Sequence, residues 1–215
     1  SIASPLRRIR LVLCQTSHPG NIGAAARAMK TMGLSRLYLV QPRFFPSPEA
    51  EARASGATDI LASAVQCSLL AEAVADCVLV IGLSARPREL VGQVWSAREA
   101  AQRAVAAAGQ LEQGSEVALV FGTEMSGLSN EELSLCQALA YIPTNPEYSS
   151  LNVAAALQIL AYECRMALQE RLQDHQRYQA PVFPLATQSE IEGLYQHLES
   201  TLTKLGFYNP AVPKR

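Results

Sequence analysis

Three short polar segments carry the side chains that could do chemistry. The first runs from Thr16 to Arg27, the second from Gly122 to Ser129, and the third from Ile142 to Val153. Each follows an expected strand and combines glycines or prolines with hydroxyl, carboxamide, carboxylate or guanidinium groups. Where such a segment runs into a helix, unpaired backbone N–H groups are available to hold a polar ligand. The pattern therefore predicts a polar ligand site.

The individual side chains also have purely structural interpretations. Ser150 could cap the helix expected after it, and Asn21 could cap the helix expected from residue 21. Glu124 could be a solvated turn carboxylate, and Asn152 a polar residue of a first helical turn. The residues taken alone leave both kinds of interpretation open.

Common nucleotide, hydrolase and metal motifs are absent from the sequence. No GxGxxG follows a strand, and Gly122-x4-Gly127 lacks the lysine of a phosphate-binding loop. No serine lies in a GxSxG elbow. The three histidines lie far apart and the five cysteines form no CxxC, so we expect no metal site. Scattered cysteines in apolar segments favour small buried residues in a reducing cytoplasm.

The elements that would position the polar segments alternate along the chain. Short β-branched runs predict strands at Ile9–Gln15, Leu37–Val40, Val78–Leu83, Val117–Phe121 and Ala140–Ile142. Amphipathic patterns predict helices at 21–32, 49–55, 69–75, 97–108, 130–137, 151–173 and 188–205. This alternation predicts an α/β domain with a mostly parallel sheet flanked by helices. Ligands collect at the carboxyl ends of such strands, where the polar segments lie.

The chain length and the change in sequence pattern near the C-terminus predict one domain with an appended segment. The chain has 215 residues, of which 49% are hydrophobic. We predict a main domain over residues 1–172, a linker over 173–189 and a helical C-terminal extension over 190–215. No apolar run is long enough to span a membrane and no signal peptide is evident, so we expect a cytoplasmic protein.

Charge is distributed unevenly. The formal net charge is −1, which gives no overall sign of nucleic-acid binding. Residues 1–60 nevertheless hold eight Lys or Arg against three acids, a balance of +5 that leaves −6 for the remainder. This asymmetry is consistent with a local basic face or with ordinary solvated charge.

The segments Asn21-Ile-Gly-Ala-Ala-Ala-Arg27, Phe121-Gly-Thr-Glu-Met-Ser-Gly-Leu-Ser129 and Ile142-Pro…Ser150-Leu-Asn-Val153 resemble the three motifs of SPOUT-class RNA 2′-O-ribose methyltransferases in order and spacing. The resemblance covers residues 8–172. It implies a C-terminal trefoil knot, a homodimer and S-adenosyl-L-methionine as methyl donor. It implies tRNA as partner, with nucleotide 32 (C or U) of the anticodon loop as target. The alternatives are ribosomal RNA, a tRNA wobble nucleotide, or a non-catalytic protein that binds the cofactor and RNA.

The resemblance also implies the site residues. The catalytic set is Arg27, Asn21, Glu124, Ser150 and Asn152. The cofactor set is Leu83, Ser84, Ala85, Gly122, Ile142, Ser149, Ser150, Leu151 and Asn152. Arg27 is expected beside the 2′-hydroxyl. Because a guanidinium stays protonated, holding the neighbouring phosphate and stabilising an alkoxide is the safer role for Arg27 than general base.

Two further expectations follow from this resemblance. Gly122 is expected to let the backbone approach the ligand closely, because it has no Cβ. Similar chains usually extend further after the linker, so we expect a truncated catalytic part, with a complete short protein as the alternative.

Overall fold

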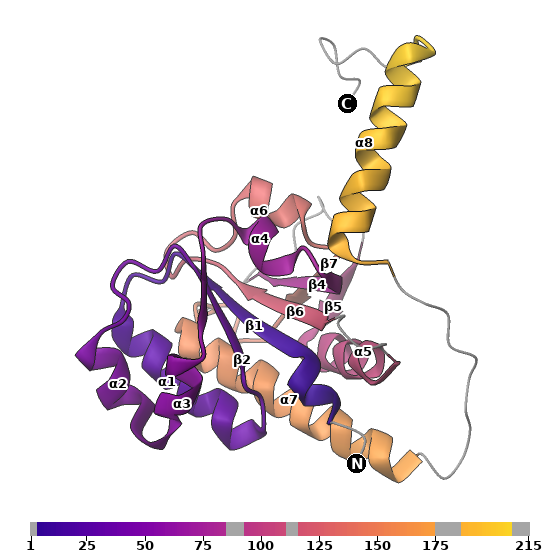
Figure 1. Ribbon diagram of the computed structural model, residues 1–215. Coiled ribbons are helices and arrows are strands. Elements are labelled where there is room, and N and C mark those ends of the chain that lie inside the picture. Colours follow the sequence, from indigo (N-terminus) through magenta and orange to yellow (C-terminus); the bar gives the residue numbers. More distant parts are fainter. Residues whose placement is uncertain (1–3, 85–92, 111–115, 175–185, 208–215) are drawn as a thin grey trace.

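The computed structural model describes residues 4–84, 93–110, 116–174 and 186–207. Its centre is a parallel sheet of seven strands in the order β3-β2-β1-β6-β4-β7-β5 (Figure 1). The strands are β1 (Ile9–Cys14), β2 (Arg36–Val40), β3 (Val65–Cys67), β4 (Cys77–Leu83), β5 (Val94–Ser96), β6 (Glu116–Phe121) and β7 (Ala138–Tyr141). The mostly parallel α/β architecture is therefore confirmed.

Helices cover both faces of the sheet. They are α1 (Pro19–Met32), α2 (Pro48–Ala54), α3 (Thr58–Ala62), α4 (Leu70–Val74), α5 (Ala97–Gln110), α6 (Asn130–Ser134), α7 (Val153–Asp174) and α8 (Gln188–Lys204), with short 3₁₀ turns η1 (Pro5–Arg8) and η2 (Ser55–Ala57). In Figure 1, α1, α5 and α7 lie on one face and α4 and α6 on the other. Each layer buries its own apolar cluster against the sheet.

The central strands are apolar on both sides because both faces are covered. All six residues of β1 are buried, and so are five of the six in β6. β1 pairs with β2 on one side and with β6 on the other. Strands from the two halves of the chain thus meet at the centre of the sheet, and their carboxyl ends share one edge.

The structure departs from the predicted elements where a segment is very short. β3 and β5 have three residues each, and neither was predicted. Helix α3, with five residues, was missed as well, and β7 begins at Ala138, two residues before its predicted start. Such segments offer too few residues for a periodic pattern, and pairing with a neighbouring strand defines β3 and β5.

Helix ends follow local rules only in part. Gly33 ends α1 with φ 84°, as a left-handed C-terminal residue should. At the end of α2, however, Ser55 adopts the positive φ of 53°. Helix α5 continues through Gly109 to Gln110. Gly56 and Gly109 are therefore not left-handed helix ends, although each follows a helical pattern in the sequence.

The appended helix α8 projects away from the domain (Figure 1). Thr187 and Glu190 form a capping box at its start. Its first turn is attached to the domain, because the amide of Ser189 donates to the carbonyl of Ala75 at 2.8 Å. Most of the predicted linker lies outside the described residues. In the described part of the chain, no helix is long and apolar enough to cross a membrane.

The five cysteines are free thiols. Four are buried and Cys67 is partly exposed, in agreement with their prediction as small buried residues. Burial raises the pKa of the Cys77, Cys136 and Cys164 thiols to about 12. These thiols are therefore protonated at neutral pH and unsuited to nucleophilic chemistry.

A buried arginine organises the amino end of the sheet, opposite the predicted site. Arg10, only 3% exposed, forms an ion pair with Asp76 at 2.6 Å and a second one with Glu116. Its guanidinium also donates to the carbonyl of Ala73 and stacks 4.4 Å from the ring centroid of Tyr38. This guanidinium is therefore structural.

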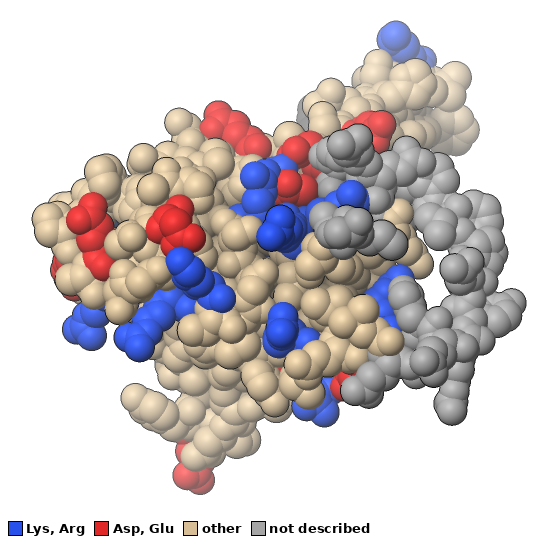
Figure 2. Space-filling model, turned by 60° about the horizontal axis from the view of Figure 1, so that its bottom comes forward, with Lys and Arg blue, Asp and Glu red and all other residues tan. Residues whose placement is uncertain are grey.

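The basic residues of the N-terminal segment do not form a continuous basic surface. In the view of Figure 2, Lys and Arg side chains are scattered over the face, with acidic side chains among them. Arg10, Lys30 and Arg36 each pair with a carboxylate. Within the described ranges, Arg27 and Arg53 form no ion pair. The visible face favours ordinary solvated charge over a basic surface.

Candidate active site

The first polar segment leaves β1 through a fixed turn. Gln15 follows the strand with a positive φ of 49°, and its amide donates to the carbonyl of Val40 at 2.8 Å. Helix α1 then starts at Pro19, with His18 as N-cap residue. Asn21 is therefore the third helical residue, and the interpretation of Asn21 as an N-cap was wrong.

The second polar segment is a tight loop after β6. Thr123 and Gly127 exchange two backbone hydrogen bonds, and the Thr123 and Ser126 hydroxyls lie 2.8 Å apart. A Cβ on Gly122 would lie 2.1 Å from the carbonyl carbon of Gly127. The bare Cα of Gly122 is thus needed because this loop folds back onto its own backbone. The close approach of a ligand to Gly122, the reason expected from sequence, stays a prediction.

The third polar segment leads into α7, and Asn152 caps that helix. Its side-chain oxygen accepts from the amides of Ala154 at 2.9 Å and Ala155 at 3.3 Å. Ser150 is therefore not the capping residue, and its exposed hydroxyl is available for another partner.

A hydrogen-bonded chain of three side chains joins the three segments. Asn152 Nδ2 donates to Asn21 Oδ1 at 2.9 Å, and Asn21 Nδ2 donates to Glu124 Oε1 at 3.0 Å. The other carboxylate oxygen of Glu124 accepts from the amide and hydroxyl of Ser17 at 3.3 and 3.2 Å. The solvated-turn interpretation of Glu124 was thus wrong.

Glu124 is held as a carboxylate. Its partial burial by itself raises the pKa, but hydrogen bonds from Asn21 and Ser17 and from its own backbone outweigh that effect. The net result is a pKa of Glu124 below its ordinary value. The charged form is therefore the one that these donors stabilise at neutral pH.

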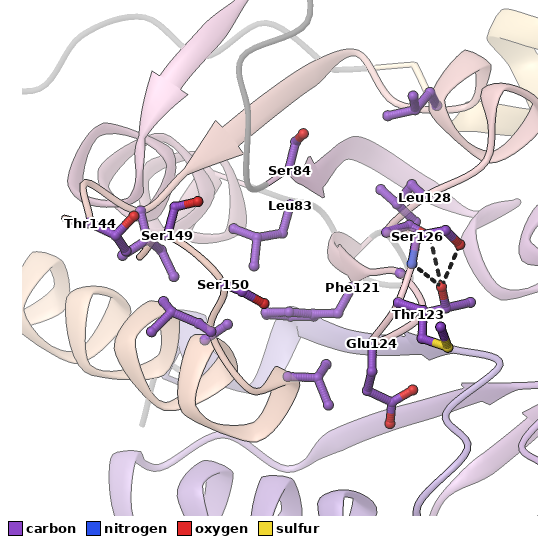
Figure 3. Close-up of a pocket in the computed structure, with 18 residues that line it drawn as sticks. Leu83, Ser84, Phe121, Thr123, Glu124, Ser126, Leu128, Thr144, Ser149 and Ser150 are labelled. Atoms are coloured by element: carbon purple, nitrogen blue, oxygen red, sulfur yellow. Dashed lines mark hydrogen bonds between the residues drawn. The ribbon is translucent and has the colours of Figure 1, made fainter. Parts of the chain in front are cut away.

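A cavity of about 400 Å³ opens at the carboxyl ends of β4, β6 and β7 (Figure 3). This volume lies within the range of about 300–1,000 Å³ typical of small-molecule sites. Apolar walls come from Leu83, Phe121 and Leu128, and Glu124 is the one charged residue of the described lining. The remaining polar lining residues are Ser84, Thr123, Ser126, Thr144, Ser149 and Ser150. The cavity suits a ligand with an apolar part and no dense negative charge.

Most of the predicted cofactor residues line this cavity. They are Leu83, Ser84, Gly122, Ile142, Ser149, Ser150 and Leu151. Asn152 does not line it but is linked to the lining residue Glu124 through Asn21. Ala85 lies outside the described residues. Tyr148, on the loop that leads into α7, is 81% exposed.

Arg27 is the predicted catalytic residue that neither lines the cavity nor belongs to the Glu124–Asn21–Asn152 chain in the described structure. Its side chain is exposed, and no contact with the described cavity lining is recorded. It lies six residues after Asn21 on α1, which corresponds to about 9 Å along the helix and about 120° around it. Arg27 thus leaves α1 on a different side from Asn21.

Sequence reasoning did not select Ser17, Thr144 or Phe121 as site residues. Ser17 lies within the first polar segment, Phe121 directly precedes the second and Thr144 lies within the third, so their positions were the available signal. Thr16 is 2% exposed, and its hydroxyl has no hydrogen-bond partner among the described residues. Those residues also contain no group of three metal-ligating side chains.

Known proteins resemble this chain over most of its length. The model of the SpoU rRNA Methylase family matches residues 8–162. The tRNA (cytidine/uridine/adenosine-2′-O-)-methyltransferase TrmJ of Pseudomonas aeruginosa is 49% identical over 215 residues, 97% of this chain and 82% of that protein.

Solved structures of methyltransferases also resemble this chain. TrmJ from Z. mobilis ZM4 superposes with a TM-score of 0.76 at 36% identity, covering 94% of this chain and 83% of that chain. A structure described by its 2-OH methylation of C/U34 on tRNA has a TM-score of 0.59 at 27% identity. The match covers 77% of this chain and 99% of that chain. The first match thus spans nearly the whole chain and the second about three quarters of it.

Proposed function

Because the chain belongs to the SpoU rRNA methylase family, we propose that it is an S-adenosyl-L-methionine-dependent 2′-O-methyltransferase of tRNA. The observation that carries this proposal is that the second and third family motifs line one cavity and that the first motif is hydrogen-bonded to Glu124 of its lining. Asn21, Glu124 and Asn152 are joined there by hydrogen bonds. The relatives named TrmJ, which act on tRNA, resemble the chain over nearly its whole length.

The cavity fits the methyl donor chemically. S-adenosyl-L-methionine, when bound, supplies an activated methyl group on a positively charged sulfur. Leu83, Ile142 and Leu128 offer apolar surface for an adenine ring. The described lining has no Lys or Arg, and Glu124 keeps its negative charge. A cationic ligand is favoured by this charge distribution.

The chain's own groups orient the reactants. Ser150 lies between the start of α7 and Phe121 in Figure 3, so its hydroxyl can hold a polar group near the cavity mouth. The Glu124–Asn21–Asn152 chain fixes the three loops relative to one another, which is the positioning that such a transfer needs. We assign to Arg27 the charge that holds the target phosphate and stabilises the developing alkoxide.

The active unit that we propose is a homodimer. The supporting observation is that Arg27 is exposed on a different side of α1 from Asn21, so Arg27 could serve a ribose bound at the partner's cavity. We also propose the trefoil knot of the resembled family. The strand order supports it, because β6 inserts between β1 and β4, and β7 between β4 and β5.

Mixing inactive variants tests the assignment of Arg27. Arg27→Ala and Ser150→Ala should each be inactive. Mixed and allowed to exchange subunits, they should regain about a quarter of wild-type activity, because about half of the dimers are mixed and each has one complete site. Lack of recovery would place Arg27 in its own protomer's site. Arg27→Lys should lose most activity and keep cofactor binding, and retained activity would remove Arg27 from the mechanism.

The substrate position that we propose is nucleotide 32 of the anticodon loop, with methylation in the cytoplasm. The TrmJ relatives support a tRNA target of relaxed base identity, since their names include cytidine, uridine and in one case adenosine. The test is to incubate the protein with labelled S-adenosyl-L-methionine and unmodified tRNA and to map the methylated nucleotide. Methyl transfer to ribosomal RNA alone, or to the wobble nucleotide, would overturn the target. Cofactor binding without transfer to any RNA would indicate a non-catalytic protein.

A further inference from the structure

An exposed aromatic ring lies close to the proposed active site, on the loop between β2 and α2. Phe44 is 54% exposed, and the guanidinium of Arg43 lies 5.2 Å from its ring centroid. Its neighbour Phe45 is partly buried against the core, so the chain turns one ring inward and leaves the other in solvent. An apolar ring exposed in this way gains free energy only when a partner covers it.

The loop that carries Phe44 is held in a defined conformation. Gln41 begins it with a positive φ of 45°, a conformation that costs a non-glycine residue free energy. The amide of Gln41 donates to the carbonyl of Cys67 at 3.0 Å, and its side chain donates to the carbonyl of Ser68 at 2.8 Å. Phe44 therefore projects from an ordered support.

Hydrogen bonds connect this loop to the active site. The amide of Arg43 donates to the carbonyl of Thr16 at 3.2 Å. The next residue, Ser17, donates from its amide and hydroxyl to Glu124. The residue before Phe44 is thus hydrogen-bonded to the residue before Ser17, and Ser17 is hydrogen-bonded to Glu124. This short connection places the Phe44 loop next to the proposed active site.

The charge around the ring favours a polyanion. Within the described residues, Arg43 and Arg53 form no ion pair, whereas Arg10, Lys30 and Arg36 on the same N-terminal segment are paired. Arg53 packs beside Gly20 at the start of α1, since its Cγ lies 3.6 Å from the position a Gly20 Cβ would occupy. Glu49 is near Gly20 as well, so one cation and one carboxylate lie beside the start of α1, and Arg43 is the cation placed against the ring of Phe44.

We propose that Phe44 and Arg43 bind a nucleotide of a single-stranded RNA loop adjacent to the methylated one, with the base stacked on Phe44 and its phosphate held by Arg43. Unstacked bases of RNA loops are recognised by stacking on aromatic rings, and an arginine supplies the backbone contact. The inference rests on the proposed function, because the neighbouring nucleotide is defined by the methylated one. It adds a binding subsite outside the three motifs.

The test measures the dissociation constant of unmodified tRNA directly, alongside methyl transfer. Phe44→Leu keeps an apolar side chain without the aromatic face and should weaken tRNA binding about tenfold, whereas Phe44→Tyr should bind like the wild type. Arg43→Gln should weaken binding and reduce the slope of log affinity against log salt by about one. The affinity for S-adenosyl-L-methionine should stay unchanged in all three variants.

Matched controls separate this subsite from general effects. Arg103 lies 4.5 Å from the ring centroid of Trp95 near the other edge of the sheet, so Arg103→Gln removes an equivalent stacked cation there. It should leave tRNA binding unchanged. An abasic nucleotide on one side of the target should weaken wild-type binding but add no further loss in Phe44→Leu, because both changes remove the same contact.

Three outcomes decide between the proposals. The subsite would be overturned if Phe44→Leu bound tRNA with wild-type affinity. It would also be overturned if the affinity loss of Phe44→Leu added fully to the loss caused by an abasic nucleotide, whichever side of the target that nucleotide lay on. If the wild type binds tRNA but transfers no methyl group, the proposed function fails while the Phe44→Leu affinity still judges the subsite. If the wild type binds no tRNA, both proposals are overturned.

Discussion

Asn21 and Asn152 share a hydrogen bond of 2.9 Å although 131 residues separate them in the chain. The Asn21 side-chain oxygen accepts that bond, and its side-chain nitrogen donates to Glu124, so both polar atoms of the carboxamide are engaged. Asn152 in turn caps α7. A helix start and a strand-end loop are therefore positioned by the same side chain.

Two replacements of Asn21 should separate the loss of its hydrogen bonds from the effect of a negative charge beside Glu124. Asn21→Ala removes both hydrogen bonds and should cost about 1–2 kcal/mol of stability. Asn21→Asp has the same shape but places a second carboxylate about 3 Å from Glu124, so it should be more damaging at neutral pH. Thermal melting and methyl-transfer rates at pH 7 check this order. Equal effects of the two variants would mean that Glu124 is not charged in the folded protein.

Gly122→Ala should damage the cavity through the backbone. The new Cβ would meet the Gly127 carbonyl carbon at 2.1 Å and the Leu128 amide at 2.3 Å, so the loop must shift. We expect a loss of about 1–3 kcal/mol in stability and a marked loss of cofactor affinity. Gly56→Ala is the matched control, because a Cβ there meets nothing within 4 Å. Calorimetric titration with S-adenosyl-L-methionine measures both variants, and equal affinities would contradict the argument.

The charge of Glu124 predicts a pH dependence. Its pKa in the folded protein lies below the ordinary value, so its contribution to stability is fully present above the unfolded pKa. That contribution is lost as the pH falls through the folded pKa. Glu124→Gln should therefore have a lower melting temperature than the wild type at pH 7. The difference in melting temperature should narrow as the pH is lowered below the usual pKa of a glutamate. A difference that stays constant with pH would show that the carboxylate is not responsible.

Arg10 should be important for folding and not for catalysis. Arg10→Met removes a buried guanidinium that pairs with Asp76 and Glu116 and should cost about 3 kcal/mol of stability. The lower end of the usual range applies because Arg36 still pairs with Glu116. Urea unfolding measures the loss. At a temperature where the variant is folded its KM for tRNA should equal that of the wild type, and a raised KM would argue for a role in binding.

The sequence predicted the longer elements and the motifs but not how the motifs connect. The buried runs of β1 and β6 and the pattern of α7 were clear because each repeats over enough residues to be recognised. Asn21 has the local appearance of a helix cap, and only the partners 103 and 131 residues away reveal its role. Side-chain pairing at such separations leaves no local pattern, so hydrogen-bond partners could not be predicted.

Arg27 illustrates a different limit. The resembled family implied its importance, but its place relative to the cavity depends on the side of α1 from which it leaves. Helical geometry alone puts it about 120° from Asn21. That geometry was available from sequence, whereas the direction of Asn21 became known only when Glu124 and Asn152 were found as its partners.

The pairing of β1 with β6 also has a consequence for synthesis of the protein. Both the central strand pair and the Asn21–Asn152 bond join the beginning of the domain to residues made more than a hundred positions later. Closing such long loops costs chain entropy before any contact repays it, so the cavity should form late in folding. A nascent chain should not bind the methyl donor until α7 has left the ribosome. Once formed, the bound donor would stabilise the completed fold by mass action.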